Sequence, residues 1–188
     1  MKAIGSLAGV LRAVFTSCLA LVAASSGAAD KKGTGIMQLT STALNEGQPI
    51  PAKYTCDEKD LSPPLKWSGV PAETKSLALI VDDPDAPVGT WVHWVLFGLA
   101  PAVTELPEDL PKSQYVLGGA RQGLNDFRRL GYGGPCPPAG KPHRYFFKLY
   151  ALDTSLQLKP GSTKKELEQA MQQHVLAEAQ LMGTYKRR

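Results

Sequence analysis

The sequence predicts a mainly β domain, built as two packed sheets, in which helical structure is confined to the C-terminal end. Three runs have the length and the apolar or aromatic content of buried strands, namely residues 75–82, 91–99 and 143–153. Helical spacing of apolar residues occurs only after residue 162. Several strands followed by a terminal helical region are typical of a sheet-on-sheet domain with helices packed at one end.

A shorter strand is expected at residues 36–41, before the turn-forming stretch 45–49. The 75–82 run is largely apolar and ends against acidic residues. In the 91–99 run, alternation would place two sets of side chains on opposite faces. The sets are Trp91, His93, Val95 and Phe97, and then Val92, Trp94 and Leu96. Both sets are largely apolar, so we expect this strand to be covered on both sides. We also expect the side chains of Trp67, Trp91 and Trp94 to pack in the hydrophobic core.

Residues 122–140 form a long stretch rich in glycine and proline. Such loops inside a compact domain are usually functional or disordered, and the presence of Tyr132 and Cys136 favours order. The strand run that follows alternates clearly. One of its faces would carry His143, Tyr145, Phe147 and Leu149.

The C-terminal region carries helix signals. Thr163 precedes Glu166 by three residues, which is the spacing of a capping box. Apolar side chains then recur at helical spacing, at Leu167, Met171, Val175, Ala179 and Met182. We therefore expect helical structure to continue to about residue 182.

The N-terminus has the pattern of a secretory signal. Lys2 and Arg12 supply positive charge, residues 10–24 are mainly apolar, and small residues follow up to residue 29. We therefore expect a signal peptide at 1–29, a flexible leader at 30–35 and a single domain at 36–188. Export to the periplasm or the outside follows, with no stable membrane insertion after cleavage; a retained anchor is the alternative.

The charge and the cysteines of the mature chain bear on two questions, whether it binds nucleic acid and whether it contains a disulfide. Removing Lys2 and Arg12 lowers the formal net charge from +4 to +2, and the remaining basic residues are scattered, which does not favour a nucleic-acid partner. Of three cysteines, Cys56 and Cys136 remain. An even pair in an exported chain predicts a disulfide, and two free buried thiols are the alternative.

Acidic and imidazole side chains cluster at the ends of the predicted strands. Asp82, Asp83 and Asp85 follow the first long strand run, His93 lies near the start of the second, and His143 opens the third. Charged and imidazole groups are rarely left unpaired inside a core. We therefore expect a small polar pocket where these strand ends meet.

Three blocks of sequence carry a resemblance to a known family. They are Asp83-Pro84-Asp85-Ala86-Pro87 with Trp91-Val92-His93-Trp94, then Gly123-Leu124-Asn125-Asp126-Phe127 through Gly131 to Pro138, and Pro142-His143-Arg144-Tyr145. With these blocks the chain resembles the phosphatidylethanolamine-binding protein family, in particular its bacterial branch of Raf-kinase-inhibitor-like proteins. The resemblance implies a Greek-key β-sandwich with a shallow cavity for a phosphate-like or carboxylate-like anion. We expect no cofactor and no metal. The implied lining is Asp83, Asp85, His93, Tyr132, Gly134, Pro138, His143 and Tyr145.

The residues of the implied pocket would bind an anion by donating hydrogen bonds to it. A carboxylate beside an imidazole favours its charged form, so Asp83 or Asp85 would keep a histidine as a donor to the anion. Backbone N–H groups of Gly133 and Gly134 would approach the anion closely, and Tyr145 would add a hydroxyl. Taken alone, the two aspartates are more typical of turn caps, and His93 of a satisfied core histidine.

One departure from the family pattern concerns the loop before Gly131. Many bacterial relatives have a glycine after the Asn-Asp-Phe string, whereas this chain has Arg128-Arg129. The departure leaves the backbone of this loop undetermined by the resemblance and adds positive charge beside the mouth of the pocket.

The leading functional hypothesis is an exported, non-catalytic protein that binds a small phosphate- or carboxylate-containing ligand. A regulatory protein that inhibits a protein partner through the pocket loops is the first alternative. A metal-dependent hydrolase built on His93, His143 and one aspartate is the second, because two imidazoles and a carboxylate can hold zinc or iron. No serine or cysteine lies in a recognised nucleophile motif.

Overall fold

The structure is a computed structural model that describes residues 36–187. The expected signal peptide and leader lie outside the described residues. Within 36–187, no helix combines the length and the apolar character needed to cross a membrane.

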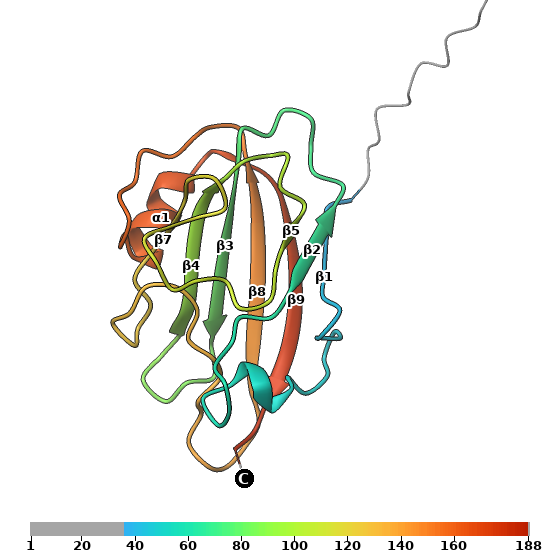
Figure 1. Ribbon diagram of the computed structural model, residues 1–188, viewed down its shortest axis with the longest axis vertical. Coiled ribbons are helices and arrows are strands. Elements are labelled where there is room, and N and C mark those ends of the chain that lie inside the picture. The colour runs from blue at the N-terminus through green and yellow to red at the C-terminus, as the bar shows by residue number, and fades with distance from the viewer. Residues whose placement is uncertain (1–35, 188) are drawn as a thin grey trace, which may run out of the picture. The chain divides into compact units, whose positions relative to one another are not determined.

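Two antiparallel sheets make up most of the described chain (Figure 1). The smaller sheet has the order β1-β2-β5 and the larger sheet the order β6-β7-β4-β3-β8-β9. The smaller sheet consists of β1 (Gln38–Thr40), β2 (Leu65–Ser68) and β5 (Glu105–Leu106). The larger consists of β3 (Ser76–Asp83), β4 (Trp91–Leu99), β6 (Tyr115–Val116), β7 (Ala120–Gln122), β8 (His143–Leu152) and β9 (Val175–Tyr185). A short 3-10 helix η1 (Ala52–Tyr54) and one α-helix, α1 (Lys164–Met171), complete the elements. The mainly β, two-sheet expectation is confirmed.

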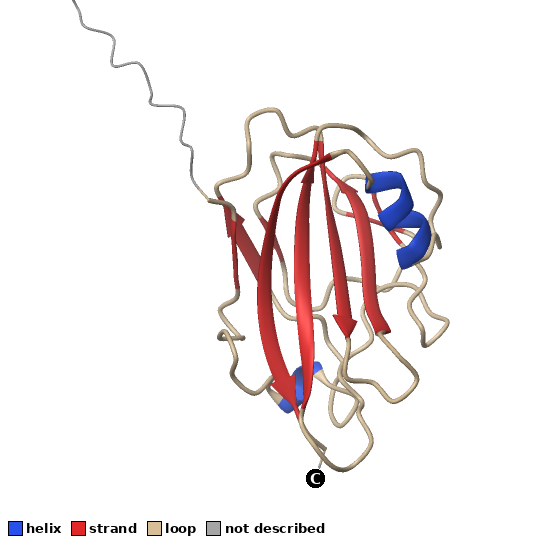
Figure 2. Ribbon diagram, turned by 180° about the vertical axis from the view of Figure 1, so that it is seen from behind, coloured by secondary structure: helices blue, strands red, loops and turns tan. Residues whose placement is uncertain are grey.

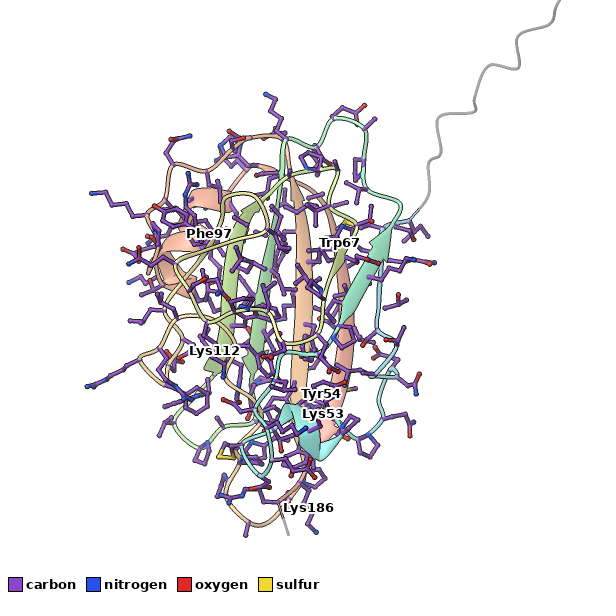
Figure 3. The ribbon with its side chains drawn as sticks, viewed as in Figure 1. Lys53, Tyr54, Trp67, Phe97, Lys112 and Lys186 are labelled. Carbon is purple, nitrogen blue, oxygen red and sulfur yellow. A yellow bond between two sulfur atoms is a disulfide. The ribbon has the colours of Figure 1, made fainter. Side chains whose placement is uncertain are left out.

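The central strands of the larger sheet, β3 and β4, are buried on both faces, which explains their long apolar runs. One face packs against the smaller sheet, and their shared core includes Trp67, Leu79 and Phe147. The opposite face packs against α1 through a second cluster that includes Phe97 and Leu167. Figure 2 shows the strands of the larger sheet from behind, with α1 near one end. Figure 3 labels Trp67 from the first core and Phe97 from the second.

The C-terminal region differs from the expectation. The capping box forms as predicted: the Glu166 N–H donates to the Thr163 hydroxyl, and the Glu166 carboxylate accepts from the Thr163 N–H. The expected helical structure beyond Met171 is wrong, because the chain leaves the helix through Gln173, which has a φ of 70°. Residues 175–185 then form β9, the partner of β8. There is one α-helix in the described chain, followed by a strand, and not a set of C-terminal helices.

The alternation expected for β4 is also interrupted. Val81 pairs with Trp94 and Asp82 pairs with Val92, so His93 is the extra residue of a β-bulge. Val92 packs with the cluster on the α1 side, whereas Trp94 belongs to the core between the sheets. The bulge lets His93 contact Tyr145, a residue of that same inter-sheet core.

Antiparallel pairing brings together the strand ends that carry the acidic and imidazole side chains of the expected pocket. β3 runs against both β4 and β8, so the end of β3 lies beside the beginnings of the other two strands. β9 ends beside the start of β8, where His143 pairs with Tyr185. In Figure 1 this is the end of the sheet nearest the C-terminus. The long loop between β7 and β8 returns to the same end, since the Gly133 N–H donates to the His93 carbonyl.

Candidate ligand-binding site

A cavity of about 190 Å³ opens at this end of the larger sheet. Its walls come from the ends of β3, β4 and β8, the loop between β3 and β4, and the loop before β8. The lining residues are Asp83, Ala86, Pro87, Val88, Trp91, His93, Phe127, Cys136, Pro137, Pro138, His143 and Tyr145. A larger depression of about 750 Å³ lies near Tyr185 and Arg187, but none of the expected pocket residues lines it. We take the smaller cavity as the candidate site because it brings together the two histidines, Asp83 and Tyr145.

Asp83 and His143 form a buried pair at the cavity wall. The Nδ1 atom of His143 lies 2.8 Å from Oδ2 of Asp83, and only 10% and 4% of the two side chains are exposed. The other oxygen, Oδ1, accepts the Asp85 N–H at 2.8 Å. Since the carboxylate accepts, Nδ1 carries the proton, and Nε2 is the ring nitrogen left for a ligand. Asp82 precedes Asp83 on β3, and strand alternation points the two side chains to opposite faces of the sheet. Asp82 therefore forms its ion pairs with Lys148 and Lys164, away from His143.

His93 is held in a neutral state by its surroundings. Its Nδ1 lies 2.6 Å from the carbonyl oxygen of Gly133. A carbonyl can only accept, so Nδ1–H is the donor and Nε2 is the free acceptor nitrogen. Burial lowers the pKa of His93, and the Gly133 hydrogen bond only partly opposes this effect. The ring also makes edge contacts with Tyr145 and Phe127, at 5.1 and 5.4 Å between centroids.

Two polar groups at the cavity lack partners. The Tyr145 hydroxyl and the Trp91 Nε1–H are buried and make no hydrogen bond within the described chain. Burial raises the pKa of Tyr145, and the charge of Asp83 raises it further, although no hydrogen bond of ordinary geometry joins the two side chains. The hydroxyl is therefore a neutral donor. Native proteins leave few buried polar groups unpaired, and those that remain call for an explanation.

Apolar side chains form the rest of the wall. Ala86, Pro87, Val88, Phe127 and Pro137 all line the cavity, and Val88 is 79% exposed. Sequence reasoning missed the roles of Val88 and Phe127 and assigned Trp91 to the core, whereas Trp91 is only partly buried and packs edge-on against Phe127. The available signal for Trp91 and Phe127 was their position inside the family blocks, whereas Val88 lies outside them.

Asp85 belongs to the neighbourhood of the cavity but does not line it. Its carboxylate accepts from Nε and Nη2 of Arg144 at 2.8 and 2.7 Å, and from the Arg144 backbone N–H at 3.0 Å. The Arg144 side-chain hydrogen bonds lower the pKa of Asp85 from 3.8 to about 2. Asp85 therefore stabilises the loop between β3 and β4.

Tyr132 and Gly134 also lie outside the lining residues. The Tyr132 hydroxyl donates to the Tyr54 carbonyl at 2.8 Å, and the Gly134 N–H donates to the Asp60 carboxylate at 2.6 Å. A Cβ at position 134 would lie 2.4 Å from the Tyr54 oxygen, so glycine is required there for close backbone packing. The expectation that the N–H groups of Gly133 and Gly134 face an anion is wrong, because both already donate within the protein. Of the expected set, the structure brings Asp83, His93, Pro138, His143 and Tyr145 together at the cavity.

The loop at Arg128-Arg129 contains a non-glycine residue with a positive φ. Arg128 has a φ of 60°, the left-handed conformation that glycine adopts most easily. The turn is held by Asn125, whose side chain accepts from the Arg129 N–H and donates to the Gly131 carbonyl. The Arg129 guanidinium lies over the Phe127 ring at 5.5 Å. The loop thus keeps a glycine-like backbone without a glycine.

Cys56 and Cys136 are joined by a disulfide. Cys136 lines the cavity, and both cysteines are exposed. The Cys56 N–H also donates to the Pro135 carbonyl at 3.1 Å. The bond therefore attaches the cavity wall at 136–138 to the segment after η1. As for metals, no group of three or more His, Cys, Asp or Glu side chains within residues 36–187 is placed to hold an ion.

Comparison with known proteins shows the family of the chain. Residues 40–186 match the family described as Phosphatidylethanolamine-binding protein. The chain therefore belongs to the phosphatidylethanolamine-binding protein family.

Individual relatives cover nearly the whole domain. A UPF0098 protein of Methanothermobacter thermautotrophicus is 54% identical over 80% of this chain and 99% of its own length, and one of Aquifex aeolicus is 51% identical over 82% and 91%. Among solved structures, a phosphatidylethanolamine-binding protein homologue from Chlamydia trachomatis matches with a TM-score of 0.75 at 47% identity, covering 81% of this chain and 99% of that one. The YbcL protein of Escherichia coli, described as a member of the mammalian family, matches with a TM-score of 0.77 at 35% identity, over 82% and 100%.

Proposed function

We propose that this protein is an exported, non-catalytic binding protein whose cavity takes a small oxyanion, a phosphate or carboxylate group. The observation that carries the proposal is the buried Tyr145 hydroxyl, which has no acceptor in the described chain. It lines the same cavity as the two histidines and Trp91, whose Nε1–H also has no acceptor within residues 36–187. These groups together call for a ligand that is rich in acceptor atoms.

The energetics favour a ligand that accepts hydrogen bonds. Leaving a buried donor unpaired costs about 1–3 kcal/mol. A ligand oxygen that accepts from Tyr145 and Trp91 would recover that free energy. Hydrogen bonds to an ionised acceptor are roughly twice as strong as neutral ones, so an oxyanion suits these donors better than a neutral carbonyl.

Other observations support the remaining parts of the proposal. The family name refers to a phospholipid whose head group contains a phosphate ester, which is a ligand of the proposed chemistry. The exposed Cys56–Cys136 disulfide is typical of oxidising compartments and so of an exported protein. The residues that line the cavity include no serine, threonine or lysine, and their one cysteine is in the disulfide. That lining favours binding over covalent catalysis.

A pair of tyrosine variants tests the proposal. Tyr145→Phe removes the unpaired hydroxyl, so we expect dimethyl phosphate to bind about tenfold more weakly in calorimetric titration, while the free energy of unfolding stays equal or rises. Tyr132→Phe is the matched control, because it removes an equally buried hydroxyl that already donates to Tyr54. The control should lose about 1–2 kcal/mol of stability and keep its affinity. Unchanged affinity in Tyr145→Phe, or no binding to the unaltered protein, would overturn the proposal.

A further inference from the structure

The titratable groups of the cavity carry no net positive charge. Asp83 and His143 form a pair whose total charge is −1 or 0, depending on the protonation of the imidazole. His93 is the second imidazole; burial lowers its pKa and so favours the neutral form, while the Gly133 carbonyl accepts from its Nδ1–H. Tyr145 and Trp91 are neutral donors. The lining thus offers hydrogen bonds to an anion without a compensating cation.

The neighbouring cations do not reach into the cavity. Arg144 is engaged by both oxygens of Asp85, and neither residue lines the walls. The Arg129 guanidinium lies over the Phe127 ring and 4.0 Å from the Asp60 carboxylate, and Arg129 does not line the cavity. No arginine or lysine is among the lining residues. A second negative charge on the ligand would therefore face the Asp83 carboxylate without a guanidinium or ammonium group to balance it.

The shape of the cavity limits the rest of the ligand. Its volume of about 190 Å³ is below the range of roughly 300 to 1,000 Å³ that is common for drug-sized ligands. The wall beyond the polar groups is made of proline, valine and aromatic side chains. Contact with this wall removes apolar surface of a ligand from water, which favours a short hydrocarbon substituent.

We infer that the cavity selects singly charged oxyanions that carry a compact apolar substituent, such as a phosphodiester or a carboxylate, over doubly charged phosphomonoesters. The inference rests on the proposed function and specifies its ligand class. It follows from the charge of the lining residues and from the apolar wall. A free phosphomonoester metabolite is accordingly a poor ligand, and the diester or carboxylate end of a larger molecule is a good one.

A series of methyl phosphates separates charge from size. Trimethyl, dimethyl and methyl phosphate carry charges of 0, −1 and about −2 at pH 8, because the second pKa of a phosphate monoester is near 6. Each is titrated into the intact protein at constant ionic strength, and the imidazole NMR signals of His93 and His143 are followed. We expect dimethyl phosphate to bind at least tenfold more tightly than either of the others.

The outcomes distinguish the two claims. If methyl phosphate binds as tightly as dimethyl phosphate, the inference fails while the proposed function stands. If trimethyl phosphate binds as tightly as dimethyl phosphate, or if no member of the series binds, the anion-binding function itself fails and the inference fails with it.

The apolar wall is tested with carboxylates. Isobutyrate adds two methyl groups to acetate, so it should bind more tightly, by about fourfold for each carbon that the wall covers. Val88→Ser should reduce that preference at least twofold, and it should fold normally because Val88 is 79% exposed. Val175→Ser is the control, since Val175 is exposed on β9 and pairs with Leu152 at the opposite end of the sheet. If the Val88 variant and the unaltered protein prefer isobutyrate over acetate equally, the claim that the apolar wall selects an apolar substituent is contradicted.

Discussion

Asp83 and Asp85 lie two positions apart, and their carboxylates have different partners. Asp83 is nearly fully buried and divides its oxygens between His143 and the Asp85 N–H. Asp85 is partly exposed and binds the guanidinium of Arg144 through both oxygens. The first carboxylate sets the tautomer of a cavity imidazole, and the second holds the loop that leads to it.

The Asp85–Arg144 pair predicts a defined pH dependence of stability. The pKa of Asp85 is lowered from 3.8 to about 2 in the folded protein, so the pair contributes above pH 4 and its contribution is lost as the pH falls through 2. Because 53% of the Arg144 side chain is exposed, we expect Asp85→Asn to lose only about 1 kcal/mol at pH 7. Urea unfolding of variant and parent should converge between pH 4 and pH 2. A stability gap that persists undiminished at pH 2 would contradict this role.

Among single residues, those at strand ends were the most predictable from sequence. The family blocks contain His93, His143 and Tyr145, and the structure brings these three residues to one cavity. They could not reveal that Gly134 and Tyr132 serve backbone packing, because their partners, Asp60 and Tyr54, lie more than 70 residues earlier in the chain. Such contacts depend on tertiary packing, which a local pattern does not specify.

At the scale of elements, β4 and the C-terminal region show where sequence patterns are ambiguous. The bounds of β4 agree with the predicted 91–99 run, but the bulge at His93 leaves no signal in composition. The spacing of Leu167, Met171 and Val175 suits a helix, yet the helix ends at Met171. Gln173 has the left-handed backbone conformation that ends many helices, and glycine usually occupies such a position. Because the residue here is glutamine, nothing in the sequence marked the helix end. From Ala179 to Thr184, buried positions alternate with more exposed ones, as in a strand with one face in the core.

The helix that does form is limited to eight residues, so its stability depends on its cap and on packing. Thr163→Ala removes the capping hydroxyl and should lower the free energy of unfolding by about 1 kcal/mol in urea titration. Ser162→Ala is the neighbouring control: its hydroxyl donates to the Lys159 carbonyl and does not cap the helix. Equal losses in the two variants would show that the capping box does not determine the helix start.

At the scale of the whole molecule, the cavity joins segments that are remote in sequence. The loop after β3, the start of β4, the 127–138 loop and the start of β8 meet because three antiparallel strands place their ends together. Sequence patterns predicted the three strands and the acidic and imidazole groups at their ends. The pairing order and the apolar wall follow from packing between distant segments, so they required the structure.

The disulfide connects the stability of the whole chain to the shape of the cavity. It closes a separation of 80 residues, and loss of a crosslink of this length destabilises a folded chain by about 4 kcal/mol in the chain-entropy model. Since Cys136, Pro137 and Pro138 line the cavity, the same loss should loosen its wall. We expect the double variant Cys56→Ser with Cys136→Ser to unfold at a lower urea midpoint and to bind dimethyl phosphate at least threefold more weakly. The unaltered protein treated with a reductant should behave in the same way, which separates loss of the bond from effects of the serines. If stability falls and affinity does not, the wall is positioned by contacts such as the Gly134–Asp60 hydrogen bond, and the disulfide acts on the unfolded chain alone.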